Sequence, residues 1–216
     1  MVRCALILLV CLAAEAPAQS PIGFGVAVKG GLNTGGWFDS AEAGQQMAVD
    51  QSSNFTGGPA LELRFADTFG VEADALYRKL GRDASGGIQG GMWTERERGS
   101  LWEFPVLAKV RLWRVARFRP FVAAGATFHR LRSDLDYSRE ELRAQPDGTV
   151  VTVRTTGTMA MSENGSGFTM GAGIERPIAP WRISIEGRYT RRDEEPSCGA
   201  RCRKPGQFLL LVGFGF

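Results

Sequence analysis

The chain has 216 residues, of which 44% are hydrophobic and 23% charged, and its formal net charge is +3 at pH 7. This composition excludes a disordered or collagen-like chain, and so small a net charge gives no reason to expect nucleic acid as a partner. The content of 28 glycines and 13 phenylalanines, against 3 tyrosines, favours β-structure over long helices.

The first part of the chain has the pattern of a secretory signal peptide. An arginine precedes the apolar run Ala5–Ala14, and Ala16–Ala18 offers the small residues that a signal peptidase recognises. The apolar run is too short to cross a bilayer about 30 Å thick, which needs about 20 residues. We therefore expect residues 1–18 to be a cleaved signal peptide and residues 19–216 to form a single barrel domain.

Eight later stretches alternate apolar residues with polar or small ones, which is the period of a β-strand. In chain order they are 22–32, 60–65, 69–78, 102–112, 118–130, 167–175, 181–190 and 207–216. In 118–130 both faces are apolar or small, so the sequence does not say which face is which. Most of the stretches approach the 9–11 residues or so that a tilted membrane strand needs.

Such alternation fits a soluble barrel of the lipocalin type, with its apolar face inward, as well as a membrane barrel. The connections separate the two classes. The long ones are 33–54, 79–100, 131–165 and 191–206, and the short ones are 66–68, 113–117 and 177–180. All long polar loops therefore fall at one end of the barrel, as in outer-membrane barrels, and aromatic residues near the strand ends would form two interfacial girdles.

These features together resemble the eight-stranded outer-membrane β-barrel family, the OmpA-like and OmpX-like barrel domains. The stretch LWEFPVLAKVRL is similar to a recurrent strand of that family. The resemblance implies an all-β, antiparallel, up-and-down transmembrane barrel in the bacterial outer membrane. It implies the lipid bilayer as the surroundings, and we expect a monomer. The chain departs from the family in one respect: no peptidoglycan-binding domain follows, so we expect a barrel alone.

In that family the barrel-assembly machinery reads the last strand, with its final phenylalanine, during biogenesis. The resemblance therefore implies an assembly signal in the last stretch of this chain. The matching residues are Phe208, Leu210, Val212, Phe214 and Phe216.

The face opposite the expected lipid-facing one carries acidic and basic side chains in equal numbers. Eight strands leave room inside only for side chains, and an unpaired buried charge is costly. We therefore expect a packed ion network in the lumen, whereas on a soluble barrel the same residues would face water. The expected members are Glu62, Arg64, Glu72, Asp74, Arg78, Glu103, Lys109, Arg111, Glu175, Arg182, Glu186 and Arg188.

No constellation in the sequence predicts catalysis, a metal site or a cofactor. The single histidine, His129, has Leu131 where the barrel-type lipid A deacylases would place a serine, so we expect it to be solvated or interfacial. In an exported chain Cys198 and Cys202 are expected to form a disulfide. The arginines of loop 191–206 suit lipopolysaccharide phosphates, and the other interpretation is ordinary solvated loop charge.

We therefore expect an outer-membrane barrel with a structural or surface-interaction role and no catalytic activity. Two alternatives stay open at this point: a secreted lipocalin-like carrier and a narrow channel. Recovery of the protein in the outer-membrane fraction rather than the soluble periplasm would separate the first alternative from the membrane barrel.

Overall fold

The computed structural model describes residues 22–34, 41–43, 46–65, 67–88, 91–193 and 206–216, and they form strands and short connections. No helix among them is long and apolar enough to cross a membrane. The strands are β1 (Gly23–Asn33), β2 (Ala41–Ala43), β3 (Gln46–Asp50), β4 (Phe55–Phe65), β5 (Phe69–Asp74), β6 (Leu76–Ile88), β7 (Gly91–Arg111), β8 (Arg119–Ala144), β9 (Val150–Ile178), β10 (Trp181–Arg192) and β11 (Gly206–Gly215).

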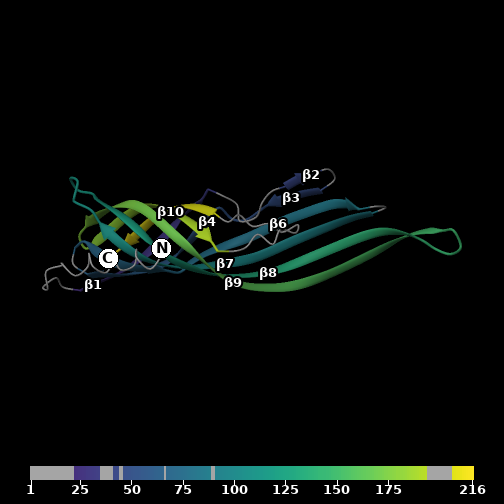
Figure 1. Ribbon diagram of the computed structural model, residues 1–216, viewed down its shortest axis with the longest axis horizontal. Coiled ribbons are helices and arrows are strands. Elements are labelled where there is room, and N and C mark those ends of the chain that lie inside the picture. Colours follow the sequence, from purple (N-terminus) through teal and green to yellow (C-terminus); the bar gives the residue numbers. More distant parts are fainter. Residues whose placement is uncertain (1–21, 35–40, 44–45, 66, 89–90, 194–205) are drawn as a thin grey trace, which may run out of the picture.

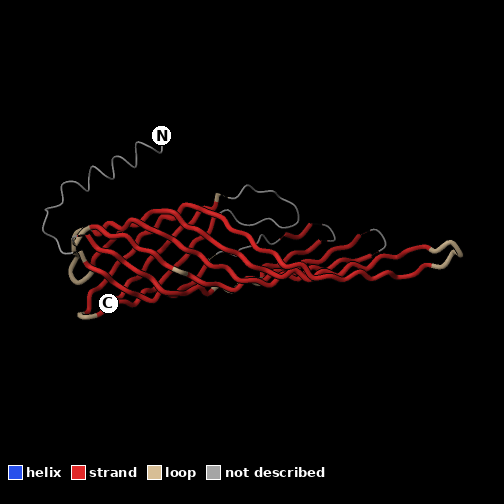
Figure 2. The backbone as a smooth tube through the Cα atoms, turned by 90° about the horizontal axis from the view of Figure 1, so that it is seen from below, coloured by secondary structure: helices blue, strands red, loops and turns tan. Residues whose placement is uncertain are grey.

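The sheet closes into a ring of eight antiparallel strands. β1 pairs with β4 on one side and with β11 on the other, and the order β1–β4–β5–β7–β8–β9–β10–β11 returns to β1. Figure 2 shows this ring as the closed mesh at one end of the molecule. The predicted fold class, an eight-stranded antiparallel barrel, is confirmed.

The predicted stretch 69–78 forms two strands in one line, β5 and β6, with a one-residue break at Ala75. Ala75 lies beside Pro59 of β4, and its N–H donates to the Pro59 carbonyl oxygen at 2.9 Å. Because Pro59 has no N–H to donate, the ladder between β4 and the β5–β6 line is interrupted at Ala75. The chain nevertheless continues in the same direction from β5 into β6.

The barrel wall is apolar outside and charged inside. Phe24 and Val28 point outward and are 65% and 66% exposed, whereas Lys29 and Arg188 point inward and are 4% and 2% exposed. In water such an arrangement would expose the apolar surface, and in a bilayer the lipid covers it. The alternative of a soluble carrier with an apolar interior is therefore wrong.

The ambiguous stretch 118–130 is settled by the burial of β8. Phe121, Ala123, Thr127 and His129 face the interior and are at most 5% exposed, while Phe128 faces outward. The expectation that His129 would be solvated or interfacial is wrong, because its parity with Phe121 along the strand turns it into the barrel.

The prediction of long loops at 79–100 and 131–165 is also wrong: within these ranges residues 79–88, 91–100, 131–144 and 150–165 continue the strands. β7, β8 and β9 have 21, 26 and 29 residues, and their outer parts, together with β6, leave the ring as an open sheet. β3 and β2 add to the β6 edge of this sheet. Figures 1 and 2 show it as a long extension, with the β8–β9 hairpin reaching furthest from the barrel.

The extension carries polar side chains on both faces, so hydrophobic alternation does not reveal it. Threonine and valine in β9 favour a strand, and two aromatic side chains cover glycines on the neighbouring strand. Trp93 lies over Gly86, and Tyr137 lies over Gly157. Aromatic cover of this kind makes up for the side chain that glycine lacks in a sheet.

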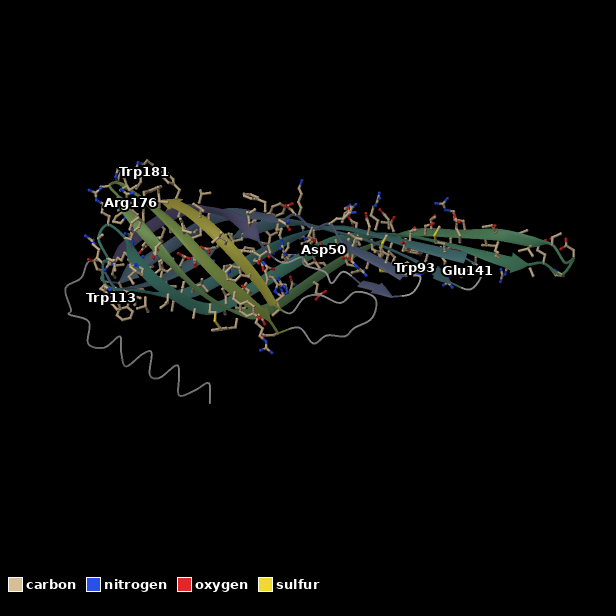
Figure 3. The ribbon with its side chains drawn as sticks, turned by 90° about the horizontal axis from the view of Figure 1, so that it is seen from above. Asp50, Trp93, Trp113, Glu141, Arg176 and Trp181 are labelled. Atoms are coloured by element: carbon tan, nitrogen blue, oxygen red, sulfur yellow. The ribbon has the colours of Figure 1, made fainter. Side chains whose placement is uncertain are left out.

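Aromatic residues mark the end of the barrel with the short turns. Trp113 and Trp181 lie there with Arg176, while Trp93 and Glu141 lie far along the extension (Figure 3). The signal peptide and its cleavage site, like Cys198 and Cys202, lie outside the described residues. The signal peptide and the disulfide stay predictions.

We predict that the ring folds without the outer part of the β8–β9 hairpin. Residues 136–158 would be replaced by Asn-Gly, which suits a two-residue hairpin turn between the paired residues Leu135 and Met159. The variant should keep the difference in gel mobility between heated and unheated samples, because every ring pairing is retained. Ala124→Pro, which removes a ladder hydrogen bond within the ring, should lose it; loss in the hairpin variant would contradict the prediction.

Candidate functional site

Three groups of charged side chains occupy the barrel interior, one above another. The group nearest the short turns contains Glu62 and Glu175, both held by Arg111 and Arg182. Arg111 donates from Nε to Glu175 and from Nη2 to Glu62. Arg182 Nη1 donates to Glu62 Oε2 at 2.7 Å and to Glu175 Oε2 at 3.4 Å. Each carboxylate is therefore shared by two guanidinium groups from different strands.

Lys109 of β7 joins this group to the next one. Its Nζ lies 3.5 Å from Glu175 Oε2 and 3.3 Å from Glu72 Oε2. It also lies 3.9 Å from the centre of the Phe121 ring, which adds a cation–π contact. A single ammonium group thus connects two layers of carboxylates.

The middle group is built around Arg188, which is 2% exposed. Arg188 donates to Asp74 Oδ2 at 2.5 Å, to Glu72 Oε1 at 2.6 Å and to Glu186 Oε1 at 2.6 Å. Lys29 Nζ contacts the same three carboxylates at 2.5–3.7 Å. Three acids and two bases therefore share one set of hydrogen bonds, with Lys109 supplying the third positive charge.

The group nearest the extension is organised by Gln207. Its side-chain oxygen accepts from Arg78 Nη2 at 3.2 Å and from Arg192 Nη2. Arg192 Nη2 also lies 3.5 Å from Glu103 Oε1. The neutral amide thus brings two arginines close to one carboxylate.

Between and above the charges the interior is filled by apolar and hydroxyl groups. Leu80, Leu101 and Leu131 form a buried cluster on the side of the extension. Thr169 Oγ1 lies 2.5 Å from Thr127 Oγ1 and 2.7 Å from Thr190 Oγ1, which gives a chain of three hydroxyls across β8, β9 and β10. A cavity of about 30 Å³ among Lys29, Glu62, Glu72 and their neighbours has room for one or two water molecules.

Of the twelve residues that the sequence analysis expected in the lumen, eleven lie inside these three groups. Arg64 lies at the border: its Nε is 4.0 Å from Glu62 Oε2, and its Nη2 donates to the Phe24 carbonyl at 3.2 Å. Lys29, Arg192 and Gln207 also belong to the network, although they were not among the predicted members. Lys29 and Gln207 could have been found from strand parity, since each alternates with outward apolar residues, whereas Arg192 lay in a stretch taken for loop.

Within the described ranges no group of three or more His, Cys, Asp and Glu side chains is placed to hold a metal ion. The chemistry that the interior offers is charge pairing between strands that are distant in sequence. The network therefore links strands across the ring.

The five residues of the expected assembly signal all face outward: four lie on β11, the strand between β1 and β10, and Phe216 directly follows it. Phe214 stacks on Trp181 with 5.0 Å between ring centres, and Phe216 meets the same indole edge-on at 5.9 Å. These contacts place the end of β11 in the aromatic rim at the turns. That the five residues are read during assembly stays a prediction.

Comparison with known proteins gives one family. A family model described as the outer membrane protein beta-barrel domain matches residues 4–216. Curated proteins give no match.

Several solved structures of outer-membrane proteins are similar over most of their length. OprG from Pseudomonas aeruginosa is 13% identical, with 93% of this chain and 99% of that chain covered and a TM-score of 0.45. Neisserial surface protein A is 11% identical, with 91% and 98% covered and a TM-score of 0.43. Ail, the attachment invasion locus protein of Yersinia pestis, is 12% identical, with 89% and 99% covered and a TM-score of 0.40.

We predict that Arg188→Ala lowers the free energy of unfolding by about 3–5 kcal/mol, because it leaves buried carboxylates with too few cations. Arg191→Ala removes an exposed arginine from the same strand and should cost less than about 1 kcal/mol. Ile185→Val, on the lipid-facing side, should also cost less than Arg188→Ala. Urea unfolding in detergent micelles measures all three.

A second substitution tests the electrostatic cause. Asp74→Asn in the Arg188→Ala background removes one stranded carboxylate and should recover part of the lost stability. If the Arg188→Ala protein were as stable as the parent, water and not the ion network would be stabilising the inward-facing carboxylates.

Proposed function

The chain belongs to the outer-membrane β-barrel family, and on that premise we propose that it acts at the bacterial cell surface, as a sealed membrane anchor that presents a β-sheet to binding partners. The observation that carries the proposal is the extension of β6–β9 beyond the ring. In the family the long connections lie on the external side and the short turns on the periplasmic side. The extension accordingly points away from the cell.

The contacts inside the ring support the sealed state. Ion pairs run from Lys29 on β1 to Glu72 on β5 and on to Lys109 on β7, and from there to Glu175 on β9. Arg182 on β10 completes the circuit to Glu62 on β4. The cross-section is thus bridged in several directions, which argues against the narrow channel.

The edge of β9 supports an interaction role. In the part of the chain that the structure describes, residues 150–160 pair with β8 and with no strand on the other side. The segment is rich in threonine and valine, has no proline, and carries a single charged side chain, Arg154. An unpaired edge of this kind can accept an extended peptide as an additional strand.

A groove on the extension lies beside this edge. It has a volume of about 760 Å³ and is lined by residues of β3, β6, β7, β8 and β9. Met47 and Val49 form an apolar side, while Asp83 and Arg96 form an ion pair at 3.3 Å on its floor. Side chains of an added strand would find both apolar and charged contacts there, which favours a protein partner.

We predict that the unmodified protein gives no large, stable openings in a planar lipid bilayer, because the lumen is filled by paired charges and leucines. The measurement is single-channel conductance of the refolded protein. Porin-sized openings in the parent would overturn the sealed state and favour the channel.

We predict that adhesion depends on the extension. Non-adherent bacteria that express the parent should attach to cultured epithelial cells or immobilised matrix proteins more than cells with an empty vector. The variant in which Asn-Gly replaces residues 136–158 should lose the gain at equal outer-membrane level, and Thr152→Lys with Thr156→Lys, which places charges on the β9 edge, should reduce it. The proposal would be contradicted if the parent gave no gain in attachment, or if both variants attached as well as the parent.

A further inference from the structure

A second pocket lies at the turn end of the barrel, below the first group of the ion network. It has a volume of about 200 Å³ and is distinct from the groove on the extension. Five arginines from β4, β7, β8, β10 and the turn before β8 line it: Arg64, Arg111, Arg114, Arg119 and Arg182. Guanidinium groups that repel one another are brought together here by strands distant in sequence.

The acidic residues that line the pocket do not balance these charges. Glu175 is already engaged by Arg111, by Arg182 and by Lys109 on the inner side. The side chain of Asp67 is 92% exposed, and its Oδ1 lies 4.0 Å from Arg119 Nη1, which is too far for a hydrogen bond. The pocket therefore has an excess of positive charge, in contrast to the paired charges deeper in the barrel.

Three donors at this pocket are shielded from solvent and have no hydrogen-bond partner among the described residues. They are Arg64 Nε, Arg111 Nη1 and Arg119 Nε. Arg111 is itself only 4% exposed, so water reaches it poorly. A buried charged donor without an acceptor is costly, and the positive charges of the five arginines that line the pocket favour an anion there.

We propose that this pocket binds a phosphate group. Phosphate offers several oxygens to several guanidinium groups at once, and the planar fork of arginine matches that geometry. The shared chemistry is a phosphoryl group, from either inorganic phosphate in the periplasm or the headgroup of an inner-leaflet phospholipid. The second source is within reach because Arg114 and Arg182, which line the pocket, directly follow Trp113 and Trp181 in the chain. The two tryptophans lie in the rim at the turn end (Figure 3), and such aromatic residues sit at headgroup level.

The bound group would also complete the ion network from below. It would neutralise Arg64 and Arg119, which the interior carboxylates do not fully serve, and would relieve the repulsion between Arg111 and Arg182. Because only the folded barrel assembles these arginines, binding should raise the stability of the barrel in proportion to ligand concentration.

The test uses the full refolded barrel in maltoside micelles, which contain no phosphate. In one arm sodium phosphate is added at constant ionic strength, with chloride as the reference, and in the other the short-chain lipid dihexanoyl phosphatidylglycerol is added. The readout is the unfolding midpoint together with the binding isotherm from calorimetry. We expect saturable binding and a rising midpoint in at least one arm, and the arm that responds identifies the source.

The variants separate a built site from a general salt effect. Arg114→Gln and Arg119→Gln should each weaken binding about tenfold or more, the effect of losing one charge-assisted hydrogen bond. Arg176→Gln is the matched control, because Arg176 lies at the same rim but faces the Phe118 ring at 5.8 Å, and it should bind like the parent. Arg114 lies in an exposed turn, so its variant folds even if the Arg119 variant does not.

Two results would overturn the proposal. One is no saturable binding of either phosphate source by the parent. The other is a midpoint shift of equal size in the parent and in Arg114→Gln, which would mean that phosphate stabilises the barrel as an excluded salt.

Discussion

Pairing of carboxylates with guanidinium and ammonium groups inside the ring is the interaction on which this structure depends. A membrane strand must turn every second side chain inward, and a ring of eight strands leaves those side chains little room for water. The inward set here is largely charged, so it is stable only if each charge meets its opposite. The contacts of Arg188 with Glu72, Asp74 and Glu186 meet that condition, and they also fix the relative positions of β5 and β10 across the barrel.

The period of two made both the ring and its inward face predictable. Once Lys109 and Arg111 are placed on one face of β7, the register of an antiparallel sheet carries the same face to Glu72 and on around the ring. The same alternation places Lys29 and Gln207 on the inward face, although neither was among the predicted members of the network. For β8 the alternation does not distinguish the two faces, because small residues lie on both. Only the closed ring shows that His129 points inward.

The extension could not be predicted from hydrophobic alternation for a physical reason. Alternation arises where one face of a strand meets lipid or core and the other does not, and along most of the extension both faces carry polar side chains. What holds the extension in register is the uninterrupted ladder from the barrel, assisted by Trp93 over Gly86 and Tyr137 over Gly157. These are pair contacts between strands, and a single sequence does not state which strands pair.

The ladder between β8 and β9 runs without interruption from the turn end of the barrel to the tip, over 26 residues of β8. At about 3.3 Å per residue this is a rod about 85 Å long, with no hinge between the part in the bilayer and the part outside it. A tether pulled from the tip along the rod would move β8 and β9 together, so it would load in shear the hydrogen bonds that β8 makes with β7 and that β9 makes with β10. Those bonds would bear the force all at once and would not open one after another as in a zipper. Mechanical force on the extension would therefore pass directly into the barrel wall, which is the most strongly paired region of the molecule.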